Sequence, residues 1–299
     1  MDSHALKCYR EAGAIARDAK LLAASMIKPG ARLVDVMEAA EDFIKSKNAG
    51  IAFPAQTSRN HIAAHYCPGI NDMTTYAAED VVKVDIGVEV DGYIADNAMS
   101  IYLGDNPHYQ KMVTASAAAL ESAISLARPG VSINEISKAI EKTIEDHSFR
   151  PVYNLTGHGV DRWKVHCKPS IPAAPDRWNK AILEPGMVVA IEPFATDGKG
   201  TVHEKGKSEI FMLTHSPKKF KGIDEQVWET IESMRGLPFA RRTFKNIKPD
   251  TIESSLSRLV RMGCLMNFPP LVDPNPNTRI TQCEHTLIIQ EDVTEVITA

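Results

Sequence analysis

The clearest pattern along the chain is an alternation of apolar and polar residues over residues 81–90. Valine or isoleucine occupies positions 82, 84, 86, 88 and 90, a period of two that predicts a β-strand. The dipeptide Asp91-Gly92 follows, and it favours a type I′ turn because both central residues of that turn need a positive φ. Residues 93–103 then return as a second strand, so the pattern predicts a β-hairpin.

The register of this hairpin places two aspartates on one face. A two-residue loop sets Asp85 opposite Ala98 and Asp96 opposite Gly87. Asp85 and Asp96 then project from the same face as diagonal neighbours, about 7–8 Å or less apart between Cβ atoms. Gly87 is expected to leave open space opposite Asp96. Two such carboxylates repel each other unless a proton or a cation lies between them, although two solvated aspartates on an exposed face are an alternative.

Helical periodicity occurs in two similar blocks at an offset of 100 residues. Lys28-Pro29-Gly30 corresponds to Arg128-Pro129-Gly130, and further apolar and acidic matches follow each break. Pro-Gly alone is common turn chemistry, but the additional matches at helical spacing favour a pseudo-symmetric duplication. The four helices are expected at about 5–27, 33–47, 107–127 and 132–147.

The second half of the chain contains further strands and one segment of different character. Strands are predicted at Met187–Ile191 and within Arg279–Gln290. Helices combined with antiparallel hairpins, instead of alternating βα units, indicate the α+β class. Residues 214–279 are expected to form an inserted helical subdomain with helices at about 224–235 and 250–262. This segment holds eleven Lys and Arg against seven Asp and Glu, either a mixed-charge surface or a nucleic-acid surface.

Composition excludes several classes of protein. The chain has 299 residues, 43% of them hydrophobic and 24% charged, with a formal net charge of −4, as is usual for a soluble globular protein of one or two domains. Its five cysteines form no Cys-x-x-Cys pair, which fits a reducing cytoplasm better than a disulfide framework. Neither a signal peptide nor a membrane-spanning segment is predicted.

Three more polar residues stand where an isolated charge is costly. His158 lies between two glycines, Glu192 ends an apolar run before Pro193, and Glu284 interrupts an apolar strand. A charge in such a place costs free energy unless it is paired or bound to a metal. Two Asp, one His and two Glu suit a pair of hard or borderline divalent cations.

These motifs resemble those of the metallopeptidases with the pita-bread fold, and within them the short, archaeal-type type II methionine aminopeptidases. The resemblance rests on the 11-residue step from Asp85 to Asp96, Gly-His158-Gly, Ile-Glu192-Pro and Glu284-His-Thr. Ala-Ala-His65-Tyr and the insertion between the two glutamates carry the subfamily assignment. The resemblance covers nearly the whole chain and implies a pseudo-two-fold antiparallel sheet backed by helices, with catalytic-domain residues 1–213 and 280–299 around the insertion.

The resemblance also implies a site. Asp85 would chelate one of two divalent metal ions (Co, Mn, Fe or Zn), Asp96 and Glu284 would bridge them, and His158 and Glu192 would hold the second. A bridging hydroxide would attack the carbonyl of an N-terminal methionine, with Glu192 as proton shuttle.

The remaining site residues surround the substrate in this reading. His166 would hydrogen-bond the tetrahedral intermediate and His65 the scissile amide, while Phe53, Val165 and Phe194 would form the methionine pocket. Expected substrates are N-terminal methionine peptides and nascent chains, with a transient ribosome contact, no membrane, and a monomer in the cytoplasm. The roles of His61, His203 and His285 stay open.

Two alternatives accompany this interpretation. A proline-specific peptidase of the same fold would usually carry an additional N-terminal domain, for which Asp85 comes too early. A non-catalytic relative that binds RNA or ribosomes through the basic insertion would have lost metal ligands, whereas this chain keeps all five. The segment Cys167-Lys168-Pro169-Ser170 departs from the group's pattern and affects the expected shape of the substrate mouth.

Overall fold

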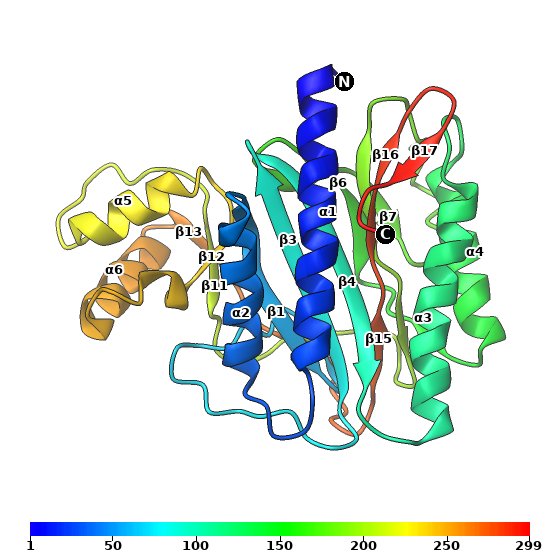
Figure 1. The fold of residues 1–299 in the computed structure, drawn as a ribbon, viewed down its shortest axis with the longest axis horizontal. Coiled ribbons are helices and arrows are strands. Elements are labelled where there is room, and N and C mark those ends of the chain that lie inside the picture. Colours follow the sequence, from blue (N-terminus) through cyan, green and yellow to red (C-terminus); the bar gives the residue numbers. More distant parts are fainter.

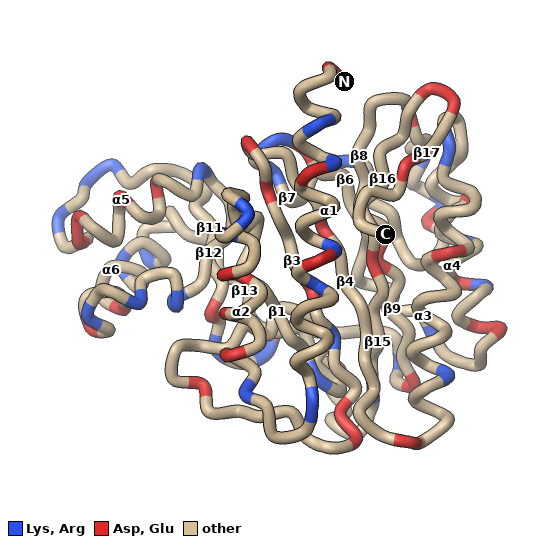
Figure 2. Tube along the Cα trace, viewed as in Figure 1, with Lys and Arg blue, Asp and Glu red and all other residues tan.

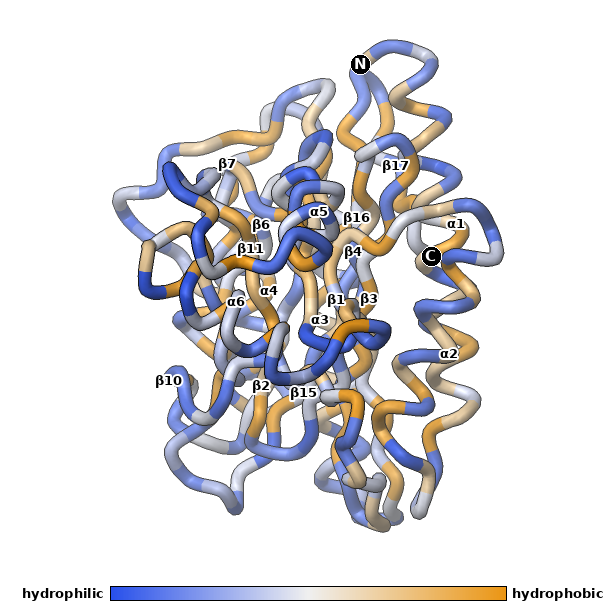
Figure 3. The backbone as a smooth tube through the Cα atoms, turned by 90° about the vertical axis from the view of Figure 1, so that its left-hand side faces the viewer, coloured by the Kyte–Doolittle hydropathy of each residue, from blue (hydrophilic) through white to orange (hydrophobic).

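Four helices cover one face of the sheets, and a smaller unit projects from one side (Figure 1). The computed structural model describes residues 1–299. The covering helices are α1 (Ser3–Met26), α2 (Leu33–Ser46), α3 (Pro107–Leu126) and α4 (Ile133–Asp146). Figure 3 shows α1 and α2 along one side of the molecule, with the projecting unit toward the viewer. All four helices lie where the sequence predicts them.

The hairpin has the predicted register. It consists of β3 (Val81–Val90) and β4 (Tyr93–Tyr102), and in it Asp85 pairs with Ala98 and Asp96 with Gly87. Asp91 and Gly92 have φ values of 52° and 83°, as a type I′ turn requires. Strand β1 (Gly50–Arg59) completes this sheet beside β3.

The offset-100 repeat is a structural duplication. The amide of Gly30 donates to the carbonyl of Tyr76 at 2.8 Å, and that of Gly130 donates to Leu183 at 2.8 Å. The two Pro-Gly turns have nearly equal φ values, 87° at Gly30 and 83° at Gly130. Helices α2 and α4 begin at Leu33 and Ile133 and are 14 residues long each. The two helix pairs therefore have the same local geometry.

A five-stranded sheet forms the second half. Its order is β17 (Thr294–Val296), β16 (His285–Ile289), β8 (Val188–Ile191), β6 (Thr156–Asp161) and β7 (Lys164–Pro172). Alternate residues of β8 face the two main cores, since Val188 and Ala190 belong to one cluster and Val189 and Ile191 to the other. This strand joins the two halves of the molecule.

The predicted strand over Arg279–Gln290 is two strands. β15 (Ile280–Gln282) pairs with β9 (Phe194–Thr196), which also pairs with β5 (Arg150–Pro151). Between β15 and β16, Glu284 forms an isolated antiparallel bridge to Ala98 of β4, with the Glu284 amide 3.0 Å from the Ala98 carbonyl. At Glu284 the chain therefore leaves its pairing with β9, contacts β4 and then pairs with β8.

The projecting unit has its own core. It contains α5 (Glu225–Ser233), α6 (Pro249–Arg261), the 3-10 helix η1 (Arg241–Phe244) and a sheet of β12 (Phe239–Ala240), β11 (Ile210–Leu213) and β13 (Leu265–Phe268). Ten buried apolar residues fill the space between the sheet and the helices. A third small sheet consists of β10 (His203–Glu204), β14 (Leu271–Val272) and β2 (Ile62–Ala64). Both predicted helices are present, while the division at residues 214 and 279 stays a prediction.

The space over Gly87 is filled, so one expectation is wrong. A Cβ atom on Gly87 would lie 2.2 Å from Cε1 of Phe53. Phe53 pairs with Gly87 across β1 and β3, beside an irregularity in the strand register. Gly87 is therefore required for close approach of an aromatic ring, and not for open space opposite Asp96.

The hairpin turn permits a matched test of packing. A Cβ on Gly92 would lie 2.3 Å from the indole of Trp163, whereas one on Gly30 would meet nothing within 4 Å, and both glycines have φ above 80°. We expect Gly92→Ala to lower the free energy of unfolding by about 1–3 kcal/mol more than Gly30→Ala, because both pay the conformational strain but only Gly92→Ala is overpacked. Urea denaturation measures the difference. Equal losses of unfolding free energy in the two variants would contradict the close packing of Gly92 against Trp163.

Candidate metal centre

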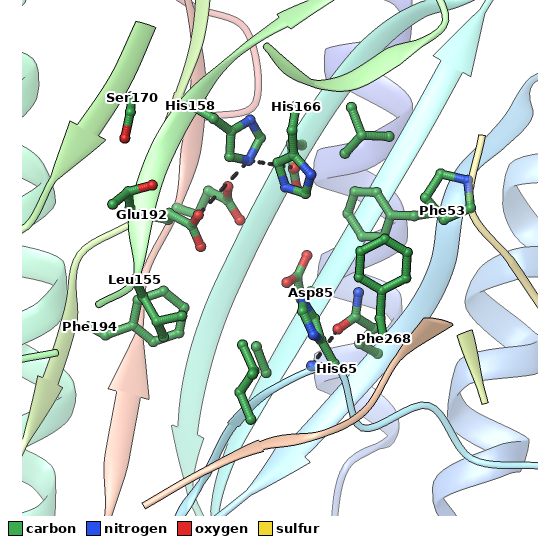
Figure 4. A pocket seen from close by; sticks show the side chains of 18 of the residues that line it. Phe53, His65, Asp85, Leu155, His158, His166, Ser170, Glu192, Phe194 and Phe268 are labelled. Atoms are coloured by element: carbon green, nitrogen blue, oxygen red, sulfur yellow. Dashed lines mark hydrogen bonds and ion pairs between the residues drawn. The ribbon is translucent and has the colours of Figure 1, made fainter. Parts of the chain in front are cut away.

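One cavity of about 540 Å³ collects every residue that the sequence analysis assigned to the site. Figure 4 shows side chains from both halves of the molecule converging on it. The ten residues are Phe53, His65, Asp85, Asp96, His158, Val165, His166, Glu192, Phe194 and Glu284. The structure thus brings together residues separated by up to 231 positions, from Phe53 to Glu284. Their individual roles stay predictions.

Four carboxylates, hereafter the carboxylate cluster, line its floor. Asp85 and Asp96 come from the β3–β4 hairpin, Glu192 follows β8, and Glu284 lies in the break between β15 and β16. One ligand atom from each of Asp96, His158 and Glu284 lies within 4.8 Å of the other two. Nε2 of His158 is 3.7 Å from a carboxylate oxygen of Asp96 and 3.9 Å from one of Glu192. These distances leave room for an ion between the groups.

The carboxylate cluster is shielded from water. Asp96 and Glu284 are 3% and 1% exposed. One buried oxygen each of Asp85 and Asp96 has no hydrogen-bond partner. Burial raises the pKa of Asp85 to about 7, and burial with mutual repulsion raises the pKa of Asp96, Glu192 and Glu284 well above the usual range. Four acids that face one cavity with little access to water, two of them with an unpartnered oxygen, match a cation site.

His158 supplies the nitrogen of this set. Its ring is buried, and burial lowers its pKa to about 3, so the imidazole is neutral and its nitrogen is free to bind a metal. Its ring stacks edge-to-face on His166, with 4.1 Å between the ring centroids. His166 is exposed at the cavity mouth. The β6–β7 hairpin therefore carries one histidine inside the carboxylate cluster and one above it.

Two side chains that no sequence motif marks as site residues support the carboxylate cluster. The side-chain amide of Gln282 donates to Glu192 at 3.2 Å. The hydroxyl of Thr286 accepts from the Asp96 amide at 2.8 Å and donates to the Asp96 carbonyl at 2.7 Å. Both residues lie within two positions of Glu284, but a Gln and a Thr in a strand carry no signal of their own.

His65 lies on the opposite wall in an unusual backbone conformation. Its φ is 65°, rare for a non-glycine residue, and its amide donates to the side chain of Gln56 at 2.7 Å. Burial lowers the pKa of His65 to about 4. Its ring lies edge-to-face on Phe268, 5.8 Å between centroids. The imidazole is therefore a neutral hydrogen-bonding group.

Apolar residues form two separate walls. Phe53 and Val165 belong to one buried cluster and Phe194 to another, and Figure 4 shows Phe53 and Phe194 on opposite sides of the cavity. Ile210, Pro238, Phe268 and Leu271 also line it, although no sequence motif marks them as site residues. Two of these, Ile210 and Phe268, lie on strands of the projecting unit.

The other histidines and cysteines do not share these positions. His61, His203 and His285 do not line the cavity, and the ring of His285 instead bonds the Thr298 hydroxyl at 2.8 Å. Cys167 lines the cavity mouth, whereas Cys67 is buried outside it. All five cysteines are free thiols.

The raised pKa values predict a pH dependence for metal-free protein. An acid whose pKa rises on folding binds a proton that the unfolded chain releases, so its contribution to stability falls as pH increases. Asp85→Asn removes this pH-dependent loss. The free energy of unfolding of the variant should therefore rise relative to that of the wild type by up to about 1.4 kcal/mol per pH unit. The rise should extend from about pH 4, the usual pKa of an aspartate, to about pH 7.

Chemical denaturation of both proteins in the presence of a chelator measures this difference. The buried histidines contribute a pH dependence of opposite sign, but they are present in both proteins, so their contribution cancels in the difference. The exposed Asp292→Asn is the control and should track the wild type. A constant difference between Asp85→Asn and wild type across this range would contradict a buried, protonated carboxylate cluster.

Comparison with known proteins places this site in a family. Residues 7–224 match Metallopeptidase family M24. A protein named methionine aminopeptidase from Archaeoglobus fulgidus is 42% identical over 297 residues, covering 97% of each chain.

Solved structures have the same fold. A thermophilic Arx1 has a TM-score of 0.86 at 17% identity, covering 99% of this chain and 91% of its own. The methionine aminopeptidase of Thermotoga maritima has a TM-score of 0.74 at 21% identity, covering 100% and 98%. The antiparallel sheets backed by two equivalent helix pairs are the pita-bread fold, as the sequence predicted, and the chain belongs to metallopeptidase family M24.

Proposed function

We propose that this protein is a metalloaminopeptidase that removes the N-terminal methionine from peptides and nascent proteins, with a preference for a small second residue. The observation that carries the proposal is the buried carboxylate cluster with His158, open on one side to a cavity with apolar walls. The 42% identity to a methionine aminopeptidase over nearly the whole chain supports the same substrate.

Two divalent cations, Co, Mn, Fe or Zn, are the proposed cofactors. The orphaned oxygens of Asp85 and Asp96 and the absence of an ion-paired Lys or Arg in the carboxylate cluster fit this requirement. The proposed ligands are Asp85, Asp96, His158, Glu192 and Glu284. When bound, such cations polarise a carbonyl and lower the pKa of water.

Glu192 is the proposed proton carrier. Of the two acids that lie next to His158, Glu192 is the more accessible: its side chain is 15% exposed, and that of Asp96 is 5% exposed. The Gln282 amide orients one of its oxygens, which leaves the other directed at the cavity. Glu192 would take a proton from the attacking water and pass it to the leaving amine.

The two histidines at the cavity walls are proposed to bind the reacting amide. His166 and His65 are neutral at physiological pH, since burial lowers the pKa of His65 to about 4, and partial burial of the His166 ring against His158 also lowers the pKa of His166, although the residue as a whole is exposed. A neutral imidazole donates a hydrogen bond without adding a positive charge beside the cations. Phe53, Val165 and Phe194 would hold the methionine side chain, and such apolar pockets discriminate by shape.

The proposal extends to the cellular compartment and the partners of the protein. None of the helices combines the length with the apolar character that a membrane-spanning segment needs. The five free thiols support a reducing compartment, and we propose the cytoplasm. We further propose a monomer that contacts the ribosome transiently through segment 214–279, where Lys and Arg outnumber Asp and Glu (Figure 2). Cosedimentation with ribosomes at low and high salt tests that contact.

The substrate assignment has a direct test. After loading with Mn²⁺ or Co²⁺, the protein should release methionine from Met-Ala-containing peptides at least about a hundredfold faster than it cleaves Xaa-Pro peptides, because the proposed pocket selects a methionine side chain and the proposed second residue is small. Chromatographic detection of the free amino acid measures both reactions. Faster cleavage of the Xaa-Pro series would indicate a proline-specific peptidase, and tight RNA binding without any cleavage would indicate a non-catalytic protein.

Glu192→Gln should separate proton transfer from metal retention. The amide still offers an oxygen but cannot take a proton, so kcat should fall about a hundredfold to ten-thousandfold. Metal analysis should find most of the bound metal retained, whereas Asp85→Asn should lose metal. The exposed Glu204→Gln is the matched control and should keep full activity. Full activity of Glu192→Gln would overturn the proposed proton carrier.

A further inference from the structure

A buried ion pair joins the projecting unit to the rest of the protein. Arg242 of η1 and Glu41 of α2 are 4% and 7% exposed. Nε of Arg242 donates to one Glu41 oxygen at 3.2 Å, and Nη2 donates to the other. This bidentate geometry orients both side chains. The pair lies outside the carboxylate cluster and has no part in the proposed proton transfer.

The pair also satisfies the backbone where β1 leaves its ladder. The register between β1 and β3 shifts between Phe53 and Gln56, so Ala55 has no strand partner there. Its amide donates to Glu41 at 3.0 Å, and its carbonyl accepts from Arg242 at 2.9 Å. A buried amide and carbonyl left unpaired would be costly. The ion pair therefore fixes an irregular piece of strand that carries Phe53 into the cavity.

The other nitrogen of the guanidinium reaches the segment that follows His65. Nη1 of Arg242 donates to the Cys67 sulfur and to the Pro68 carbonyl, the latter at 3.0 Å. His65, in its left-handed conformation, lies two residues before Cys67. The His65 amide is in turn held by Gln56, the first residue back in the β1–β3 ladder. One guanidinium thus lies between the segments that carry Phe53 and His65.

We propose that Arg242 and Glu41 are positioning residues for substrate binding: they hold the Phe53 wall of the methionine pocket and the backbone of His65 in register with the carboxylate cluster. The inference rests on the proposed function and adds a role for the projecting unit, which supplies Arg242. The pair touches none of the proposed metal ligands, so its loss should change substrate binding and leave metal binding intact.

A purely stabilising role makes a different prediction. A buried ion pair can often be replaced by apolar residues with little loss of stability. Here such a replacement would still leave the Ala55 amide and carbonyl without partners. The double variant Glu41→Leu/Arg242→Met therefore removes the positioning bonds without stranding one buried charge, and it keeps the test valid if Arg242→Met alone fails to fold.

Steady-state kinetics on metal-loaded full-length protein tests the proposal. We expect Arg242→Met and the double variant to raise KM for a Met-Ala peptide about tenfold or more, with kcat changed less than about threefold. The selectivity of the variants for methionyl over leucyl peptides should fall as KM rises. Glu41→Gln retains an acceptor for the Ala55 amide and should be milder than Glu41→Leu. Arg10→Gln, which removes the exposed pair with Glu295, is the control.

The outcomes separate this inference from the proposed function. A loss of folded enzyme would lower apparent kcat at unchanged KM, which would overturn the positioning role. Wild-type KM and selectivity in a folded double variant, with metal content unchanged, would also overturn it. Absence of methionine release by the wild type would instead defeat the proposed function, because the variants are read only against an active parent.

Discussion

Mutual repulsion among four buried acids is the constraint on which the rest of the structure depends. Asp85, Asp96, Glu192 and Glu284 face one point with little access to water, and such a group is stable only when protons or cations lie among its members. Rigid surroundings must hold the acids in place against that repulsion. The two-residue turn, the bridge at Ala98 and the bonds from Gln282 and Thr286 provide this support.

Local patterns were sufficient to predict the parts of the site that lie on one strand or one hairpin. The pairing of Asp85 with Ala98 followed from turn length alone, because a two-residue loop fixes every pair beyond it. The equivalence of α2 and α4 followed from repeated residues at a constant offset. The meeting of Asp85 with His158 and Glu284 could not be derived in this way, and it was inferred from resemblance to a family.

Features that depend on contact between distant segments were missed or wrong. Gly87 was expected to leave open space, but the ring of Phe53 fills it, because β1 pairs on the other edge of β3. The break before Glu284 has no local signal, because residues 279–290 alternate only in part and contain no Gly or Pro that would divide the strand. Arg242 and Glu41 are 201 positions apart, and nothing near either of them in sequence predicts a buried pair.

The division of the ligands between the two halves has a consequence for assembly. The hairpin of the first half carries Asp85 and Asp96, and the second half carries His158, Glu192 and Glu284. Either half on its own would hold no complete site and would have to capture the other half from solution. Joining both in one chain makes that encounter intramolecular, with an effective concentration on the order of millimolar. The centre is thereby complete in a single polypeptide, however dilute the protein is.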